Sequence, residues 1–83
     1  MMMGLSMWIK CKDRLPPKDG VYMTAEKYGE HIVYRIVPYV RDLGRGRYMP
    51  GYEGKSGFYD SDPEYGSFVI KPEAWKYIEK YRG

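Results

Sequence analysis

The chain has very few of the side chains that metal sites and catalytic nucleophiles require. Cys11 is its only cysteine and His31 its only histidine among 83 residues. A single cysteine excludes an internal disulfide and a cysteine-based zinc cluster, and it favours a reducing compartment. A catalytic nucleophile needs a base within reach and usually a third orienting group, and no pattern around either residue supplies them. We predict a protein that is not an enzyme and uses no cofactor or metal.

Long apolar runs are also missing. No stretch approaches the roughly 20 apolar residues needed to cross a bilayer. The opening residues have neither the basic start nor the apolar run of a signal peptide. We therefore expect a cytoplasmic protein without membrane contact. Residues 1–6 are interpreted as a ragged N-terminus, and residues 7–83 as a single globular domain.

The composition is that of a folded chain with a mild charge. Apolar residues make up 43% and aromatic residues 17% of the sequence, too much for a disordered chain. Ten tyrosines against two phenylalanines indicate a thin core whose aromatic edges reach water. The net charge of +3 and the pI near 9.0 describe an ordinary solvated surface. Charge alone therefore does not indicate a nucleic-acid partner.

The longest alternation of apolar side chains covers residues 31–40, HIVYRIVPYV. A spacing of two, rich in β-branched and aromatic residues, predicts a strand. Proline cannot donate to a ladder, so Pro38 predicts either an edge or a bulge at that position. Residues 21–27 alternate in the same way. The short glycine-containing segment between the two runs predicts a β-hairpin.

Shorter elements are expected on both sides of this hairpin. We predict strands at residues 7–10, around residues 58 and 59, and at residues 67–70. The segment PEAWKYIEKYR, residues 72–82, opens with proline and a carboxylate and ends with basic residues, which is typical of a short helix with Trp75 in its buried stripe. The sequence therefore predicts an α+β domain, a small mainly antiparallel sheet of four or five strands with one C-terminal helix.

Several residues occur in an order that matches a known pattern. Trp8 and Ile9 are followed by RLPP at 14–17, GVY at 20–22, GFY at 57–59 and a closing Trp75. This order resembles a small phage and prophage family, domain of unknown function 551, which opens with WI and RLP and ends in a THWMPLP-like segment. Ala74 stands where the family has histidine. The resemblance spans nearly the whole chain and implies a phage or mobile-element origin and a compact sheet, without catalytic residues.

The best candidate for a contact surface is the segment 41–57, which holds five of the ten glycines and is expected to form no regular element. Glycines allow close approach to a ligand, arginines grip phosphate or carboxylate, and tyrosines stack. Such a set suits a nucleotide, a single-stranded nucleic acid or an acidic protein face. The alternative is a long solvated loop. The candidate contact residues are Arg41, Arg45, Arg47, Tyr48, Tyr52 and Lys55.

An acidic turn follows this basic segment. Asp60, Asp62 and Glu64 suggest a metal site or an acid–base pair, but Pro63 departs from a calcium loop and an ordinary turn is favoured. A basic segment and an acidic turn on one molecule would orient a partner or join two copies.

These patterns predict binding rather than catalysis. We expect a phage- or prophage-derived accessory protein that engages a macromolecule of the bacterial host cell, most directly a host protein. A nucleic-acid or nucleotide binder that uses the segment 41–57 is the alternative. A thin sheet leaves apolar edges, so a homodimer is a further expectation.

Overall fold

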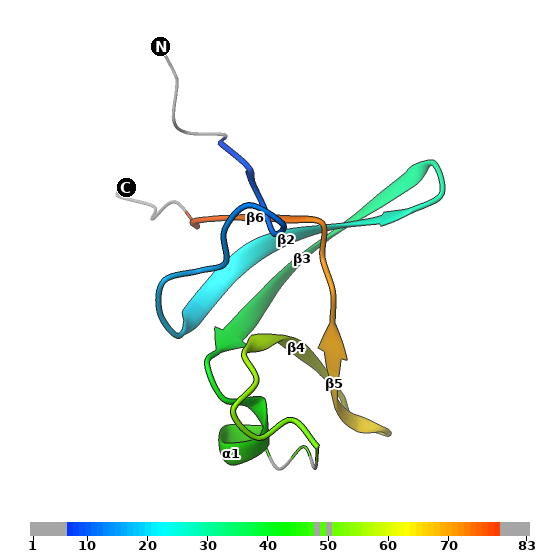
Figure 1. Ribbon diagram of the computed structural model, residues 1–83. Coiled ribbons are helices and arrows are strands. Elements are labelled where there is room, and N and C mark those ends of the chain that lie inside the picture. The colour runs from blue at the N-terminus through cyan, green and yellow to red at the C-terminus, as the bar shows by residue number, and fades with distance from the viewer. Residues whose placement is uncertain (1–6, 48, 50, 79–83) are drawn as a thin grey trace, which may run out of the picture.

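The computed structural model describes residues 7–47, 49 and 51–78 (Figure 1). Six strands form one antiparallel sheet with the strand order β1-β6-β2-β3-β4-β5. The elements are β1 (Ile9–Lys10), β2 (Gly20–Tyr28), β3 (His31–Val40), α1 (Leu43–Arg47), β4 (Gly57–Asp62), β5 (Gly66–Ile70) and β6 (Ala74–Lys76).

The expected α+β class is wrong, because the segment predicted as a C-terminal helix is a strand over Ala74–Lys76. This strand lies between β1 and β2, with Trp75 paired to Ile9 on one side and to Thr24 on the other. Proline and charge signals at helix ends contribute only about 1 kcal/mol or less each, and a short helix is marginal without tertiary support. Pairing on both sides therefore decides the conformation. Residues 79–82 of the expected helix lie outside the described residues.

The segment 41–57 was expected to have no regular element, and this is wrong at one place. Residues Leu43–Arg47 form the five-residue helix α1. Within the described part of the chain, no helix has the length and apolar character needed to span a bilayer.

The central hairpin is confirmed. Strand β3 has the predicted bounds, and β2 pairs with it in a single register from Gly20 opposite Tyr39 to Tyr28 opposite His31. Gly29 begins the two-residue loop with φ of 62°, a conformation that favours glycine. In Figure 1 the tip of this hairpin projects beyond β4 and β5. The strands expected near 58–59 and at 67–70 lie within β4 and β5, and the first strand is shortened to Ile9–Lys10.

The hydrogen-bonding sides of β3 follow from one contact on β2. The carbonyl of Ala25 accepts a hydrogen bond from the N–H of Glu73 at 2.8 Å, so it points away from β3. Bonding sides alternate along an antiparallel pair. Because Ala25 is paired with Tyr34, the main-chain groups of Tyr34 also point away from β2. The same holds for every second residue of β3, including Pro38.

Pro38 therefore lies where an N–H would face β4. The ladder between these strands consists of Tyr39 with Phe58 and Val40 with Gly57. The next position that needs a donor is Pro38, which has none. The β3–β4 ladder ends there, and the rest of β3 is left without this neighbour. Of the two alternatives predicted at Pro38, an edge or a bulge, the structure shows the edge.

The sheet curls so that its two ends are joined by a short link. β5 lies at one end of the strand order and β6 near the other, yet only residues 71–73 connect them (Figure 1). The curl closes the inner face around a row of aromatic rings from neighbouring strands. Trp75 meets Tyr22 edge to face at a centroid distance of 5.2 Å. Tyr22 meets Tyr39 at 6.4 Å, and Tyr39 meets Phe58 at 4.9 Å. Such pairs stabilise by about 0.5–1.5 kcal/mol beyond area burial.

Two side chains of this aromatic row donate hydrogen bonds to main-chain carbonyls of the connector between β1 and β2. The indole N–H of Trp75 donates to the carbonyl of Arg14 at 2.8 Å, and the hydroxyl of Tyr22 donates to the carbonyl of Lys18 at 2.9 Å. Burial raises the pKa of Tyr22, whose hydroxyl is already protonated and able to donate at neutral pH. The proline-rich connector is thereby fixed against the core.

We predict that Trp75→Ala lowers the free energy of unfolding by about 3–5 kcal/mol, because Trp75 is fully buried and its indole anchors the connector. That loss approaches the whole stability of a small domain. Trp8→Ala is the matched control, since Trp8 is only partly buried and lies on the opposite face of the sheet. We expect this control to lower the free energy of unfolding, measured by chemical denaturation, by less than half as much as Trp75→Ala does. Equal losses would contradict the assigned core.

Candidate functional site

Large apolar side chains stand exposed on the outer face of the central hairpin. Val21 is 55% exposed, Ile32 51%, Tyr34 61% and Ile36 60%. Their neighbours in sequence, such as Val37 and Tyr22, point to the inner face and are buried. We call Val21, Ile32, Tyr34 and Ile36 the outer strip. Exposed apolar side chains grouped on one face mark interaction sites more often than singly scattered ones do.

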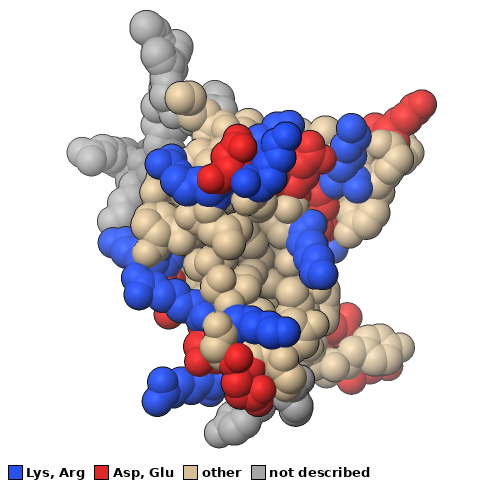
Figure 2. Space-filling model, in the orientation of Figure 1, with Lys and Arg blue, Asp and Glu red and all other residues tan. Residues whose placement is uncertain are grey.

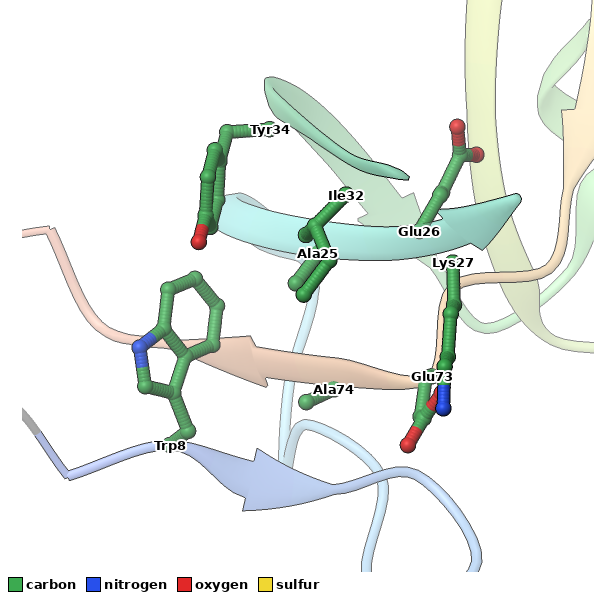
Figure 3. A pocket seen from close by; sticks show the side chains of 8 residues that line it. All are labelled: Trp8, Ala25, Glu26, Lys27, Ile32, Tyr34, Glu73 and Ala74. Atoms are coloured by element: carbon green, nitrogen blue, oxygen red, sulfur yellow. The ribbon is translucent and has the colours of Figure 1, made fainter. Parts of the chain in front are cut away.

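A trough of about 250 Å³ lies beside the outer strip (Figure 3). Its floor is formed by Ala25 of β2 and Ala74 of β6, which are paired and whose small side chains leave the space open. Trp8 and Tyr34 stand together at one end, with ring centroids 5.9 Å apart. The full lining is Trp8, Ala25, Glu26, Lys27, Ile32, Tyr34, Glu73 and Ala74. This geometry suits an apolar or aromatic side chain of a partner.

Basic groups flank the trough. The ammonium of Lys76 lies 5.0 Å from the centroid of the Trp8 ring, a cation–π contact. Lys27 stands at the end away from the aromatic pair, next to Glu73 in the view of Figure 3. Lys10 forms an exposed ion pair with Glu73 at 3.5 Å. A ligand with an apolar side chain and a nearby carboxylate would find complementary groups here.

Sequence reasoning missed the trough because its two halves are far apart in the chain. Ala25 and Ala74 become neighbours only when residues 74–76 enter the sheet as β6. The available signal was the alternation on β3, which places Ile32, Tyr34 and Ile36 on a face separate from Val37 and Tyr39. It does not show which face is covered.

Arg35 joins three strands on the inner side of the hairpin. Its Nε donates to the carboxylate of Glu26 on β2 at 2.9 Å, and its Nη1 donates to Asp60 on β4 at 2.9 Å. Glu26 is buried, and it also accepts a hydrogen bond from the hydroxyl of Tyr28 at 3.1 Å. The hydrogen bond to Glu26, followed by its charge and by Asp60, raises the pKa of Arg35 above its ordinary value. The charge of Arg35 is therefore matched internally.

The acidic turn uses its carboxylates for structure. Asp60 is paired with Arg35. One carboxylate oxygen of Asp62 accepts hydrogen bonds from the N–H groups of Glu64 at 2.7 Å and Tyr65 at 3.1 Å, which fixes the turn. Among the described residues, no group of three histidine, cysteine or acidic side chains is arranged to hold a metal ion.

The segment 41–57 folds around Asp42. Its carboxylate accepts hydrogen bonds from the N–H groups of Arg45 at 3.0 Å and Gly54 at 2.9 Å, so it caps α1 and holds the returning chain. These backbone hydrogen bonds lower the pKa of Asp42. A side chain at Gly44 would place its Cβ 2.6 Å from the backbone nitrogen of Glu53, so only glycine fits. The segment is a packed unit rather than a free arm.

Of the candidate arginines in this segment, the structure describes the side chains of Arg41 and Arg45. The guanidinium of Arg41 donates to the carbonyl of Pro17 at 3.0 Å, so it ties the connector to the segment. The side chain of Arg45 is exposed near α1. Arg47 lies in α1, but its side chain is outside the described part of the structure, and Tyr48 lies outside it altogether.

Tyr52 and Lys55 are brought together at a groove of about 640 Å³. Lys71 contributes a second ammonium group from the link between β5 and β6. The side of the molecule seen in Figure 2 shows an uncharged central area bordered by lysine and arginine side chains and, above and below it, by acidic ones as well. The remaining lining is mostly apolar and includes Leu15, Phe58, Val69, Ile70 and Pro72. Cys11 also lines the groove, and burial raises the pKa of its thiol, which disfavours the reactive thiolate.

We predict a pH-dependent role for Asp42. Because its pKa is lower in the folded chain than its ordinary value of 3.8, its contribution to stability is full above that value and is lost as the pH falls through the folded pKa. Asp42→Asn should therefore lower Tm at pH 6, and the gap from the wild type should narrow toward pH 3. Glu64→Gln, at an exposed carboxylate, is the control and should show no such narrowing. A gap that stays constant for Asp42→Asn between pH 6 and pH 3 would refute this role.

Comparison with protein-family models, curated proteins and solved structures finds no match for this chain. The resemblance to the phage and prophage family therefore stays a prediction, and the function is argued from the geometry of the outer strip, the trough and the groove.

Proposed function

We propose that this protein is a non-enzymatic binding module that engages another protein through the outer strip and the trough. The observation that carries the proposal is the exposure of four large apolar side chains on one face of a paired hairpin. Side chains held on paired strands lose little further freedom on binding, which reduces the cost of association. Aromatic side chains such as Trp8 and Tyr34 are also the type that most often dominates binding energy.

The chemistry of this face favours a protein over a nucleic acid. Nucleic-acid affinity depends mainly on cations that contact phosphates. The outer strip contains no cation, and of the lysines beside the trough Lys10 is paired with Glu73 and Lys76 lies over the ring of Trp8. An extended segment with an apolar side chain for the trough, and an acidic residue near Lys27 or Lys76, fits the face best. If the resemblance to the phage and prophage family holds, the partner is a cytoplasmic protein of the bacterial host.

We predict that a displayed library of random peptides, selected on the full chain, converges on apolar sequences with an acidic residue. Trp8→Ala removes one wall of the trough and should weaken the selected peptide about tenfold or more, about 1.4 kcal/mol. Ile32→Thr should weaken it as well.

Val33→Thr is the matched control, because Val33 is the next residue on β3 and points to the opposite face. It should leave peptide affinity unchanged. Failure of the library to converge, or equal effects of Ile32→Thr and Val33→Thr, would overturn the proposal.

A second candidate function is nucleotide binding at the groove near residues 51–58. Two ammonium groups, Lys55 and Lys71, and the ring of Tyr52 border an apolar hollow whose volume lies in the range of small-molecule sites. Lysines can hold phosphate and tyrosine can stack on a base.

We predict that millimolar ATP or GTP raises Tm by about 4 °C or more if this groove binds nucleotides, because a ligand that binds only the folded state stabilises it. Lys55→Gln combined with Lys71→Gln should abolish the shift. Arg45→Gln is the control, since Arg45 is basic and exposed but does not line the groove. No shift with either nucleotide would remove this candidate.

A further inference from the structure

We propose that the free edge of β3 pairs with β3 of a second copy of this chain, forming an antiparallel dimer with its two-fold axis at Tyr34. The inference concerns the edge of the strand and does not rest on the proposed function, which concerns the face of the same strand. A single surface used identically by both copies makes a closed dimer rather than a chain of subunits.

The edge is available over most of β3. Within the described residues, β4 pairs on β3 only with Tyr39 and Val40, and no strand pairs with residues 31–37 on that side. The register places the main-chain N–H and C=O groups of Ile32, Tyr34 and Ile36 on this free side. A row of unpaired groups in an extended strand is a template for another strand.

The usual protections against such pairing are missing between residues 32 and 36. Protein edges are blunted by lysine, proline, bulges or short length. The sequence here is IVYRI, without lysine or proline. Its one charge, on Arg35, is matched by Glu26 and Asp60 at 2.9 Å each. The edge is therefore apolar and electrically neutral, and it lies on a strand of ten residues.

The spacing of side chains makes this edge complementary to itself. With the axis at Tyr34, Ile32 lies opposite Ile36 of the partner subunit, and Tyr34 lies opposite Tyr34 of the partner subunit. Three pairs of this kind would supply about six main-chain hydrogen bonds. Aromatic and β-branched residues facing one another stabilise a sheet by about 0.2–1 kcal/mol per pair. A self-matching sequence of this kind argues for a second copy rather than an unrelated strand.

Pro38 fixes the register. With the axis at Tyr34, Pro38 falls at the end of the new ladder, opposite Glu30 of the partner subunit, where its missing N–H has little effect. An axis shifted to Ile36 would place Pro38 opposite Tyr34 of the partner subunit and remove hydrogen bonds from the middle of the ladder. The two outer strands of the sheet are poorer templates for pairing with a second copy, because β1 has two residues and β5 begins with Gly66 and Ser67.

Pairing of this kind would also join the two outer strips. Ile32, Tyr34 and Ile36 of each copy project from the same side of the extended sheet, so six large side chains would form one apolar surface across the axis. The dimer would present a wider docking face than either copy alone.

The test is the molecular mass of the full chain across a concentration series, measured by light scattering and sedimentation equilibrium. We expect the wild type to dimerise in the micromolar range. Tyr34→Lys and Tyr34→Glu each place like charges next to one another at the axis, and each should raise the dissociation constant at least tenfold. Mixing the two variants should restore a one-to-one heterodimer, which a misfolded variant would not form.

Tyr65→Lys is the matched control, because Tyr65 is 83% exposed and lies in the turn between β4 and β5, away from the edge. It should dimerise as the wild type does. A wild type that stays monomeric at millimolar concentration, charge variants that still dimerise, or a mixture that does not reassociate would each overturn the proposal. A monomer that still selects peptides through Trp8 would leave the proposed function intact.

Discussion

The absence of one N–H group, at Pro38, governs how this sheet is built. The alternation along β3 places that position toward β4, where the ladder has already formed two pairs and needs a donor to continue. Without the donor, the β3–β4 ladder stops after these two pairs, whereas on its other edge β4 pairs with β5 from Phe58 to Asp62. One half of β3 therefore belongs to the curled sheet, and the other half projects in a hairpin held on one side only (Figure 1).

Arg35 replaces the missing ladder with side-chain contacts. Its two hydrogen bonds, to buried Glu26 and to Asp60, connect β2, β3 and β4 just beyond the point where main-chain pairing ends. A buried carboxylate left without its cation typically costs 3–5 kcal/mol, although partial exposure of Arg35 and Asp60 reduces the figure here. The same contacts neutralise the charge on β3. The contacts of Arg35 that hold the hairpin in place therefore also leave its free edge without an unmatched charge that would disfavour pairing with another strand.

The hairpin could be predicted from sequence because its signals are local: an alternation of two and a glycine at the loop. The strand at Ala74–Lys76 could not, because proline, glutamate and the spacing of aromatics satisfy a helix equally well, and only pairing with Ile9 and Thr24 decides. The segment 41–57 shows the same limit. Its glycines and arginines indicate an open loop, whereas Asp42 and the close approach at Gly44 make it compact. The floor of the trough is formed by Ala25 and Ala74, which are 49 positions apart in the sequence, and no local pattern connects them.

The exposure of the outer strip follows from how a chain of 83 residues forms a core. A small domain has too little chain to cover both faces of a sheet with a second layer. Here the sheet curls on itself, and the aromatic row from Trp75 to Phe58 fills the inner face. Strands alternate their side chains, so apolar residues on the other face of β2 and β3 remain in water. Replacing Ile32, Tyr34 and Ile36 by polar residues would remove no side chain from that inner core. The inner core therefore does not account for these apolar side chains, and this supports the proposal that they contact another surface.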